Sequence, residues 1–212
     1  MTLRSALDHL VVVCRDLAQG AAWLRERTGV EPQPGGKHKL MGSHNALLRL
    51  GARTYLELLA IDPAAAQPAR PRWFGLDDAA AQRRAASAPY LASWVVACGD
   101  VARAAQLVPA LGEVVPISRG LLALRIAIPA SGVPPLGGAL PAVVEWENEL
   151  HPCDALEARG CELAELRVAH SEAGAIRSAL AALGFAGPCT VEEGAPSLAA
   201  RLRTREREIL LS

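Results

Sequence analysis

The sequence predicts an α+β protein built from repeated β-α-β-β-β modules. Three segments, beginning at Leu7, Leu91 and Leu163, share one pattern: an apolar strand, a polar cap, a helical stretch and a closing glycine. The first two segments align without a gap, so that Cys14 falls on Cys98. Strand-like runs follow each helix, separated by turns rich in glycine. A repeat of this kind outweighs any single-segment assignment.

Each repeat carries residues suited to begin and end a helix. Asp16 and Asp100 precede the first two helices, where a carboxylate accepts free backbone N–H groups and complements the positive end of the helix dipole. Gly29 closes the first helix, because glycine readily adopts the left-handed conformation of a C-terminal turn. In the third repeat, the cap falls on Glu172 or on Ser171.

The repeats divide the chain into consecutive parts. We expect a first module over residues 1–62, a connector over 63–90, a second module over 91–150 and a third over 151–212. Proline and alanine dominate the connector, which nevertheless predicts a short helix over Asp77–Ser87.

The last strand of the first module, beginning at Thr54, places a charged residue among apolar ones. Tyr55 and Glu57 point to one face of this strand, and Leu56 and Leu58 point to the other. A carboxylate facing an apolar interior is costly unless a cation or a hydrogen-bond donor meets it. Alternatively, Glu57 faces solvent from an edge strand.

Composition narrows the class of protein. The chain has 212 residues, of which 51% are hydrophobic, enough for a well-filled core. Its 22 basic and 22 acidic residues cancel, which argues against a nucleic acid or an anionic membrane as partner. Five cysteines without a CxxC pair, and the lack of a signal peptide or a long apolar run, predict a cytoplasmic location.

The repeated modules resemble the vicinal oxygen chelate superfamily, which includes glyoxalase I, extradiol dioxygenases and proteins of fosfomycin and bleomycin resistance. Within it, the sequence is most similar to the glyoxalase-like domains. The segments that carry the resemblance are LDHLVVVCRDL, GGKHKLMGSHNALLRLGARTYLELLAIDP, RWFGLD, LPAVVEWENELHP and LAELRVAH. The resemblance implies that two modules pair into a curved, partly closed sheet with a metal ion inside it.

The resemblance also implies metal ligands at the start of the first strand and the middle of the last strand of each paired module. These positions hold His9, Glu57 and Glu145, while the fourth falls on Ser93, a poor ligand that departs from the family pattern. One imidazole and two carboxylates suit a divalent ion such as Zn, Mn, Fe, Co or Ni with a position open for substrate. Such an ion polarises a carbonyl or activates water.

His38 and Glu145 are the candidate catalytic residues. His38 follows a Gly-Gly turn before a strand expected to line the same cavity, where it would be an extra ligand or an acid–base group. For His44, four residues before Leu48, we favour a role in satisfying the backbone of the turn.

Two functions remain open at this point. The first is a metal-dependent enzyme of lyase, isomerase or dioxygenase type, acting on a small oxygen-bearing substrate between the paired modules. The dioxygenase branch needs His38 as a ligand, because iron in that chemistry takes two histidines and one carboxylate. The second is a metal-free protein that binds or sequesters a small molecule, as resistance proteins of this fold do. Signatures of dinucleotide binding, P-loops, zincins and serine hydrolases are absent from the sequence.

A third module leaves one sheet face without a mate inside the chain. An open apolar face has to be buried. The sequence therefore predicts a homodimer that associates through the third modules.

Overall fold

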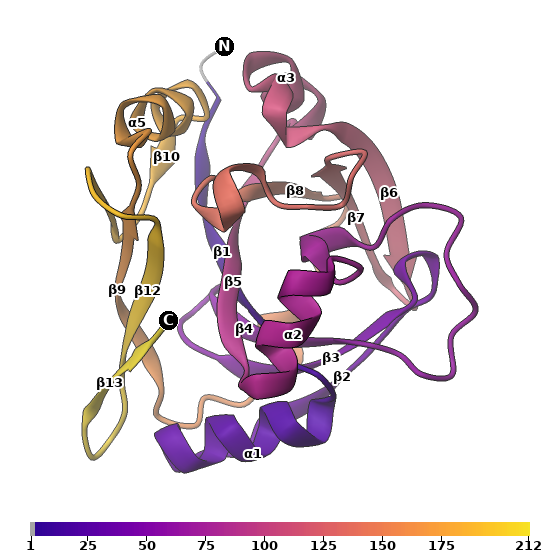
Figure 1. Cartoon of the computed structure of the whole chain (residues 1–212), viewed down its shortest axis with the longest axis vertical. Helices are drawn as coiled ribbons and strands as arrows, with labels where there is room; N and C mark the ends of the chain where they lie inside the picture. The colour runs from indigo at the N-terminus through magenta and orange to yellow at the C-terminus, as the bar shows by residue number, and fades with distance from the viewer. Residues whose placement is uncertain (1–2) are drawn as a thin grey trace.

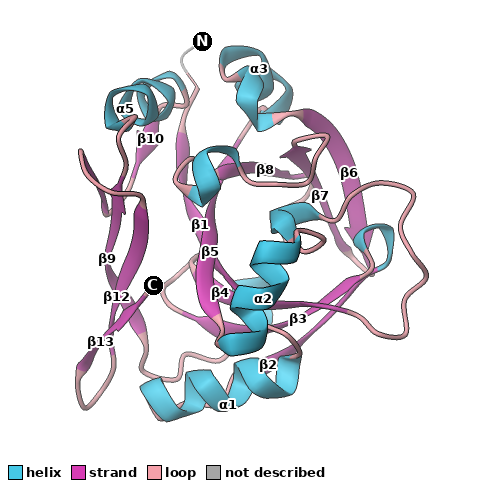
Figure 2. Cartoon of the chain, in the orientation of Figure 1, coloured by secondary structure: helices cyan, strands magenta, loops and turns pink. Residues whose placement is uncertain are grey.

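The computed structural model describes residues 3–212 and confirms the α+β fold class. Two β-α-β-β-β modules share one curled, partly closed sheet, and a smaller sheet stands beside it (Figure 1). The strand order of the larger sheet is β2-β3-β4-β1-β5-β8-β7-β6, with the short β10 also paired to β1. Figure 2 shows α1, α3 and α5 at the periphery of these strands.

The elements follow the predicted order of strands and helices. The first module contains β1 (Ser5–Val13), α1 (Leu17–Thr28), β2 (Gln33–His38), β3 (Ser43–Arg49) and β4 (Tyr55–Ile61). The connector contains α2 (Ala79–Ser87), and the second module contains β5 (Tyr90–Cys98), α3 (Val101–Leu107), β6 (Glu113–Arg119), β7 (Leu122–Ile128) and β8 (Ala142–Trp146). The remainder contains α4 (Pro152–Ala155), β9 (Glu162–Ala169), α5 (Ala173–Ala182), β10 (Phe185–Ala186), β11 (Cys189–Glu192), β12 (Ser197–Arg203) and β13 (Glu208–Leu211).

The helix caps confirm most of what the sequence predicts. Asp16 accepts a hydrogen bond from the Gln19 N–H, and Gly29 is left-handed with φ 73°. Asp78 caps α2, so this helix begins two residues after the predicted start at Asp77. At the third repeat, Glu172 occupies the cap position, but its side chain makes no capping hydrogen bond.

The two paired modules meet along β1 and β5, which run antiparallel in the middle of the sheet. In each module the last strand lies parallel to the first: His9 of β1 is beside Tyr55 of β4, and Val95 of β5 is beside Ala142 of β8. The start of β1 and the middle of β4 are therefore neighbours in space, which brings the first module's functional side chains together.

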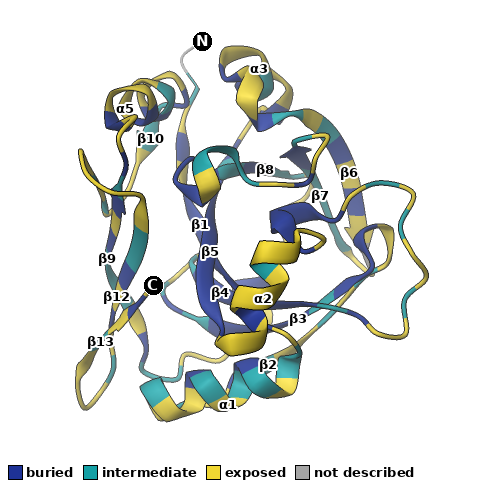
Figure 3. Cartoon of the chain, in the orientation of Figure 1, coloured by how far each residue is buried: buried dark blue, intermediate teal, exposed yellow. Residues whose placement is uncertain are grey.

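The central strands β1, β4 and β5 are buried on both faces of the sheet (Figure 3). On the convex side, Leu10 and Leu58 pack with Leu24 of α1 in one core cluster. On the concave side, Val11 and Leu59 join a second cluster. Trp73 and Ala85 of the connector belong to that second cluster, so the connector covers part of the concave face.

The third segment keeps the order of elements but pairs its strands differently, as β11-β9-β12-β13. Its apolar face, which includes Leu166 and Leu202, joins the same core cluster as Leu10 of the large sheet. Its outer face is polar, where Glu165 forms ion pairs with Arg167 and Arg201. The apolar sheet face on which the predicted homodimer was based is thus covered within the chain. The homodimer stays a prediction, but this face no longer supports it.

Among residues 3–212, no helix is both long and apolar enough to cross a lipid bilayer.

Packing between the two sheets predicts a large effect of truncating Leu166, which is fully buried. Leu166→Ala should lower the free energy of unfolding by about 2–5 kcal/mol, because it removes buried methyl groups and leaves a cavity. The matched control is Leu210→Ala, since Leu210 is 64% exposed; we expect a change within about 0.5 kcal/mol. Urea denaturation measures both, and equal effects would contradict the packing described.

Candidate functional site

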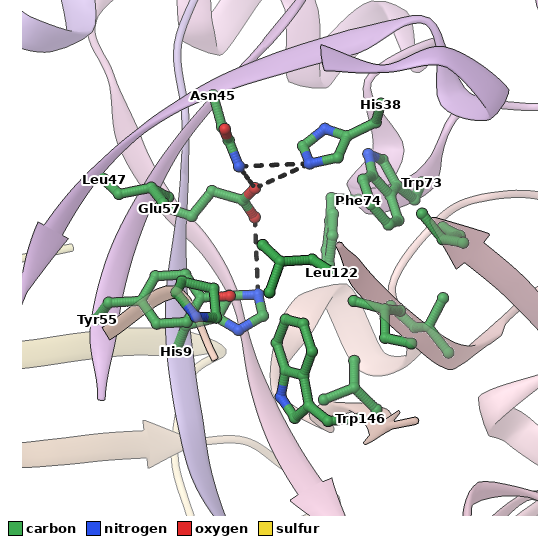
Figure 4. Close-up of a pocket in the computed structure, with 15 residues that line it drawn as sticks. His9, His38, Asn45, Leu47, Tyr55, Glu57, Trp73, Phe74, Leu122 and Trp146 are labelled. Carbon is green, nitrogen blue, oxygen red and sulfur yellow. Dashed lines mark hydrogen bonds and ion pairs between the residues drawn. The ribbon is translucent and has the colours of Figure 1, made fainter. Parts of the chain in front are cut away.

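A cavity opens on the concave side of the sheet between the two paired modules (Figure 4). Its empty volume, including the open mouth, is about 560 Å³. The lining residues are His9, His38, Asn45, Leu47, Tyr55, Glu57, Trp73, Phe74, Ile117, Leu122, Leu124, Ile126, Val144, Trp146 and Pro152. The sheet curvature and the connector together shape this space.

A bulge in β1 brings two adjacent polar residues to the site. The pairing of β1 with β5 shifts between Leu7 and His9, which leaves Asp8 as the extra residue. Leu7 and Leu10 both belong to the convex core cluster. In regular alternation these two would face opposite sides, so the bulge accounts for both Asp8 and His9 lying on the side of the cavity.

Asp8 is buried, with 2% of its surface exposed, and three side chains donate hydrogen bonds to it. His9 Nδ1 lies 2.6 Å from Oδ1, and Trp146 Nε1 and His151 Nε2 lie 2.8 and 3.2 Å from Oδ2. Burial by itself would raise the pKa of Asp8, but the hydrogen bonds from His151 and His9 outweigh it and lower the pKa well below its ordinary value. Asp8 is therefore a carboxylate at neutral pH.

The hydrogen bonds assign the protons on two imidazoles. The His151 Nδ1 accepts the Cys153 backbone N–H at 3.2 Å, so its own proton is on Nε2 and points to Asp8. The ionised Asp8 likewise requires a proton on His9 Nδ1. Neutral His9 consequently presents the lone pair of Nε2 to the cavity, where its ring is stacked on Tyr55 with centroids 4.6 Å apart.

Glu57 is buried opposite His9 and is held by Asn45. The Asn45 Oδ1 accepts the Gly36 N–H at 2.7 Å, which orients the amide so that Nδ2 donates to Glu57 Oε1 at 2.6 Å. The approach of Asn45 requires a glycine at position 35, because a Cβ there would lie 2.0 Å from Oδ1. The other carboxylate oxygen, Oε2, lies 3.6 Å from His9 Nε2.

His38 lies on the other side of the Glu57 carboxylate (Figure 4). Its Nδ1 is 3.1 Å from Ser43 Oγ, and its Nε2 is 3.3 Å from Asn45 Nδ2 and 3.8 Å from Glu57 Oε1. Asn45 Nδ2 is a donor, so His38 Nε2 accepts and the proton of neutral His38 is on Nδ1. The edge of the ring meets Trp73, with centroids 4.9 Å apart.

The predicted placement of Glu145 in the cavity is wrong. Its neighbours Val144 and Trp146 line the cavity, while its own carboxylate accepts hydrogen bonds from Arg125 Nη2 at 2.5 Å and from the Val101 N–H at 2.9 Å. The register explains this: Glu57 lies beside Val11, but the corresponding Val95 of β5 lies beside Ala142. The structural counterpart of Glu57 is therefore Ala142.

Ser93, at the fourth ligand position that the resemblance implies, also does not line the cavity. It is fully buried in β5, and its hydroxyl donates to the Trp94 carbonyl at 3.4 Å. Of the predicted ligands and catalytic residues, the structure brings His9, His38 and Glu57 together and leaves Glu145 apart.

The side chains at the cavity do not fit a bound divalent ion in the arrangement described. His9 and His38 face different oxygens of Glu57, at 3.6 and 3.8 Å, and the second module adds only apolar atoms and the Trp146 ring. Within residues 3–212, no group of three or more His, Cys, Asp or Glu side chains is placed to hold a metal ion. We therefore derive no chemical step through a metal.

Sequence reasoning missed Asp8, Asn45 and His151 as parts of the site. Asp8 directly precedes His9, and Asn45 follows His44 near the turn, so their proximity in sequence was the available signal. His151 joins Asp8 from 143 positions away and also caps α4, and no sequence pattern pairs two such distant residues.

Comparison with known proteins agrees with the fold. A family model described as a glyoxalase-like domain matches residues 7–184. The chain belongs to the glyoxalase-like domain family. This places it in the vicinal oxygen chelate superfamily, as the resemblance implies.

The fold is shared with a solved structure of low sequence identity. A hypothetical protein from Staphylococcus aureus is 13% identical, with a TM-score of 0.57, over 90% of this chain and 86% of that one. A methylmalonyl-CoA epimerase from Mycobacterium tuberculosis is 17% identical, with a TM-score of 0.41, over 66% of this chain and 85% of that one. No curated protein gives a significant match.

The three donors around Asp8 predict that this glyoxalase-like protein depends on its charge for stability. Asp8→Asn should cost about 3–5 kcal/mol of unfolding free energy, because an amide N–H₂ then faces groups that are themselves donors. The control is Glu149→Gln, which neutralises an exposed carboxylate. Urea denaturation at neutral pH measures the difference, and equal stability of the two variants would contradict the assignment.

The lowered pKa of Asp8 also predicts an acid limit to stability. In the unfolded chain its ordinary pKa is 3.8, so below that pH the unfolded state binds the proton more readily than the folded state. The contribution of Asp8 is complete above about pH 4 and decreases as the pH falls further. Denaturation from pH 5 down to about pH 2 should show a shallower decline for Asp8→Asn than for the native protein.

Proposed function

We propose that this glyoxalase-like protein is an acid–base enzyme of isomerase or lyase type that acts on a small oxygen-bearing substrate, with His9 as the base. The observation that supports this proposal is the 2.6 Å hydrogen bond between Asp8 and His9 Nδ1, which directs Nε2 into the cavity. The 3.6 Å between Nε2 and Glu57 Oε2 exceeds hydrogen-bond length, so a substrate atom can approach both.

The proposed step is a proton transfer from carbon. His9 Nε2 takes a proton from a C–H next to a carbonyl, and the electron pair moves to the carbonyl oxygen to form an enolate. The resulting imidazolium is stabilised by Asp8 at Nδ1 and by Glu57 near Nε2. If the deprotonated carbon carries a hydroxyl group, its proton moves to the enolate oxygen, and the abstracted proton returns to the former carbonyl carbon, which completes an isomerisation with the carbonyl now on the neighbouring carbon. Alternatively, expulsion of a leaving group with its electron pair from the carbon next to the deprotonated one forms a C=C bond and completes an elimination.

His38 is the proposed second proton-transfer group. It faces Glu57 on the side away from His9, so two imidazoles reach a substrate from different directions. Protonated His38 would donate from Nε2 to the enolate oxygen and no longer accept from Asn45, whose Nδ2 still donates to the Glu57 carboxylate. The buried surroundings strengthen each of these interactions, because water does not screen them.

The metal-dependent enzyme and the metal-free binding protein are the competing functions for this cavity. A divalent ion such as Zn, Mn, Fe, Co or Ni would need His9, His38 and Glu57 to move closer together, since within residues 3–212 they are not placed to hold a metal ion. The binding protein would use the same lining without proton transfer.

Exchange of carbon-bound hydrogen for deuterium tests the proposal without knowledge of the natural substrate. The protein is incubated in D₂O with dihydroxyacetone, pyruvate or acetophenone, and loss of the signal next to the carbonyl is followed by proton NMR. The native protein should accelerate exchange of at least one probe over buffer. His9→Gln should lower that rate roughly 100-fold or more, the contribution typical of a positioned general base.

The matched control is His44→Gln, because His44 is on the neighbouring strand but does not line the cavity; its rate should equal the native rate. Exchange that survives His9→Gln would overturn the role of His9. Metal analysis of untagged protein supplies a second readout. A stoichiometric divalent ion that is lost in His9→Gln would favour the metal-dependent enzyme instead.

A further inference from the structure

We infer that the ligand of this cavity is an uncharged molecule with a carbonyl or hydroxyl group at one end and an apolar body at the other. The inference rests on the proposed function only in placing the oxygen-bearing end beside His9. The chemistry of the lining, which differs between the two modules, carries the rest.

The polar and the apolar lining residues of the cavity come from different modules. The hydrogen-bonding groups His9, His38, Asn45 and Glu57 all come from the first module. The second module contributes apolar side chains and one indole ring: Ile117, Leu122, Leu124, Ile126, Val144 and Trp146. Figure 4 shows Leu122 and Trp146 facing the cavity across from Asn45. A ligand that satisfies both walls is polar at one end only.

The charge of the cavity disfavours an anionic ligand. Glu57 lines it and Asp8 lies directly behind His9, whereas no Lys or Arg is among the lining residues that the structure describes. A carboxylate or phosphate entering the cavity would lose its hydration beside Glu57 and Asp8 without meeting a Lys or Arg side chain.

Basic residues next to the lining positions are turned away and paired. Lys37, which precedes His38, forms an ion pair with Asp62 at 2.8 Å. Arg72, which precedes Trp73, is held by Asp77 at 2.6 Å. Arg125, between Leu124 and Ile126, pairs with Glu145 on the opposite face of the sheet. Strand alternation and the connector thus keep these three basic side chains out of the cavity.

Aromatic side chains shape the cavity on the side of the connector. Trp73 and Phe74 both line it, with ring centroids 5.4 Å apart. Together with the apolar wall of the second module, they present apolar surface to the body of the ligand.

Acetophenone and benzoate form a pair of probes that share a ring and differ in charge. Binding is followed by ¹⁵N-labelled tryptophan NMR, because the Trp146 Nε1–H donates to Asp8 beside the cavity. Trp23 on α1 does not line the cavity and serves as the internal reference. Acetophenone should shift the Trp146 resonance at a concentration at least tenfold lower than the concentration of benzoate that gives the same shift. Equal or tighter binding of benzoate would overturn the inference.

Leu122→Gln tests the contribution of the apolar wall to binding, and Glu57→Gln tests the effect of the cavity's negative charge. Leu122→Gln should weaken acetophenone binding roughly fivefold by removing apolar contact. Leu121→Gln, at an adjacent side chain that is 81% exposed and does not line the cavity, should leave binding unchanged. Glu57→Gln should strengthen benzoate binding relative to acetophenone. An unchanged ratio of the two affinities in Glu57→Gln would contradict the charge argument.

The two proposals fail in different ways. Acetophenone binding without deuterium exchange on any probe would retain this inference and overturn the acid–base function. Exchange of pyruvate together with preferential binding of benzoate would retain the acid–base function and overturn this inference.

Discussion

The buried carboxylate of Asp8 is the constraint on which the site depends. It receives hydrogen bonds from His9 on its own strand, from Trp146 at the end of β8 and from His151 at the start of α4. A buried charge without partners would be costly, so these three elements have to meet around it. These hydrogen bonds to Asp8 join the first module, the second module and the segment that follows β8. They also fix the orientation of His9.

The bulge in β1 shows how a local irregularity creates function. A regular strand would place Asp8 and His9 on opposite faces, and the dyad would not form on the cavity side. The extra residue also restores the alternation, so that Leu10 and Leu58 still pack on the convex side. The site is therefore obtained without loss of core packing, which is a common use of bulges beside functional sites.

The two paired modules have the same topology but different tasks. The first supplies the hydrogen-bonding groups, and the second supplies an apolar wall. The polar groups of the first module are not repeated in the second, because Ala142 occupies the position in β8 that corresponds to Glu57 in β4. Glu145 instead accepts the Val101 N–H at the start of α3 and pairs with Arg125, which makes it a structural residue of the second module.

The sequence alone determined the modular repeat, the α+β class, the caps at Asp16 and Asp100 and the strand face that Tyr55 and Glu57 share, because these follow from local patterns of polarity and period. Tertiary structure decided the rest. The register between β5 and β8 turned Glu145 away from the cavity, and a one-residue difference in register reverses the face of a side chain. Chain folding also brought His151 to Asp8 across a separation that no periodic pattern records.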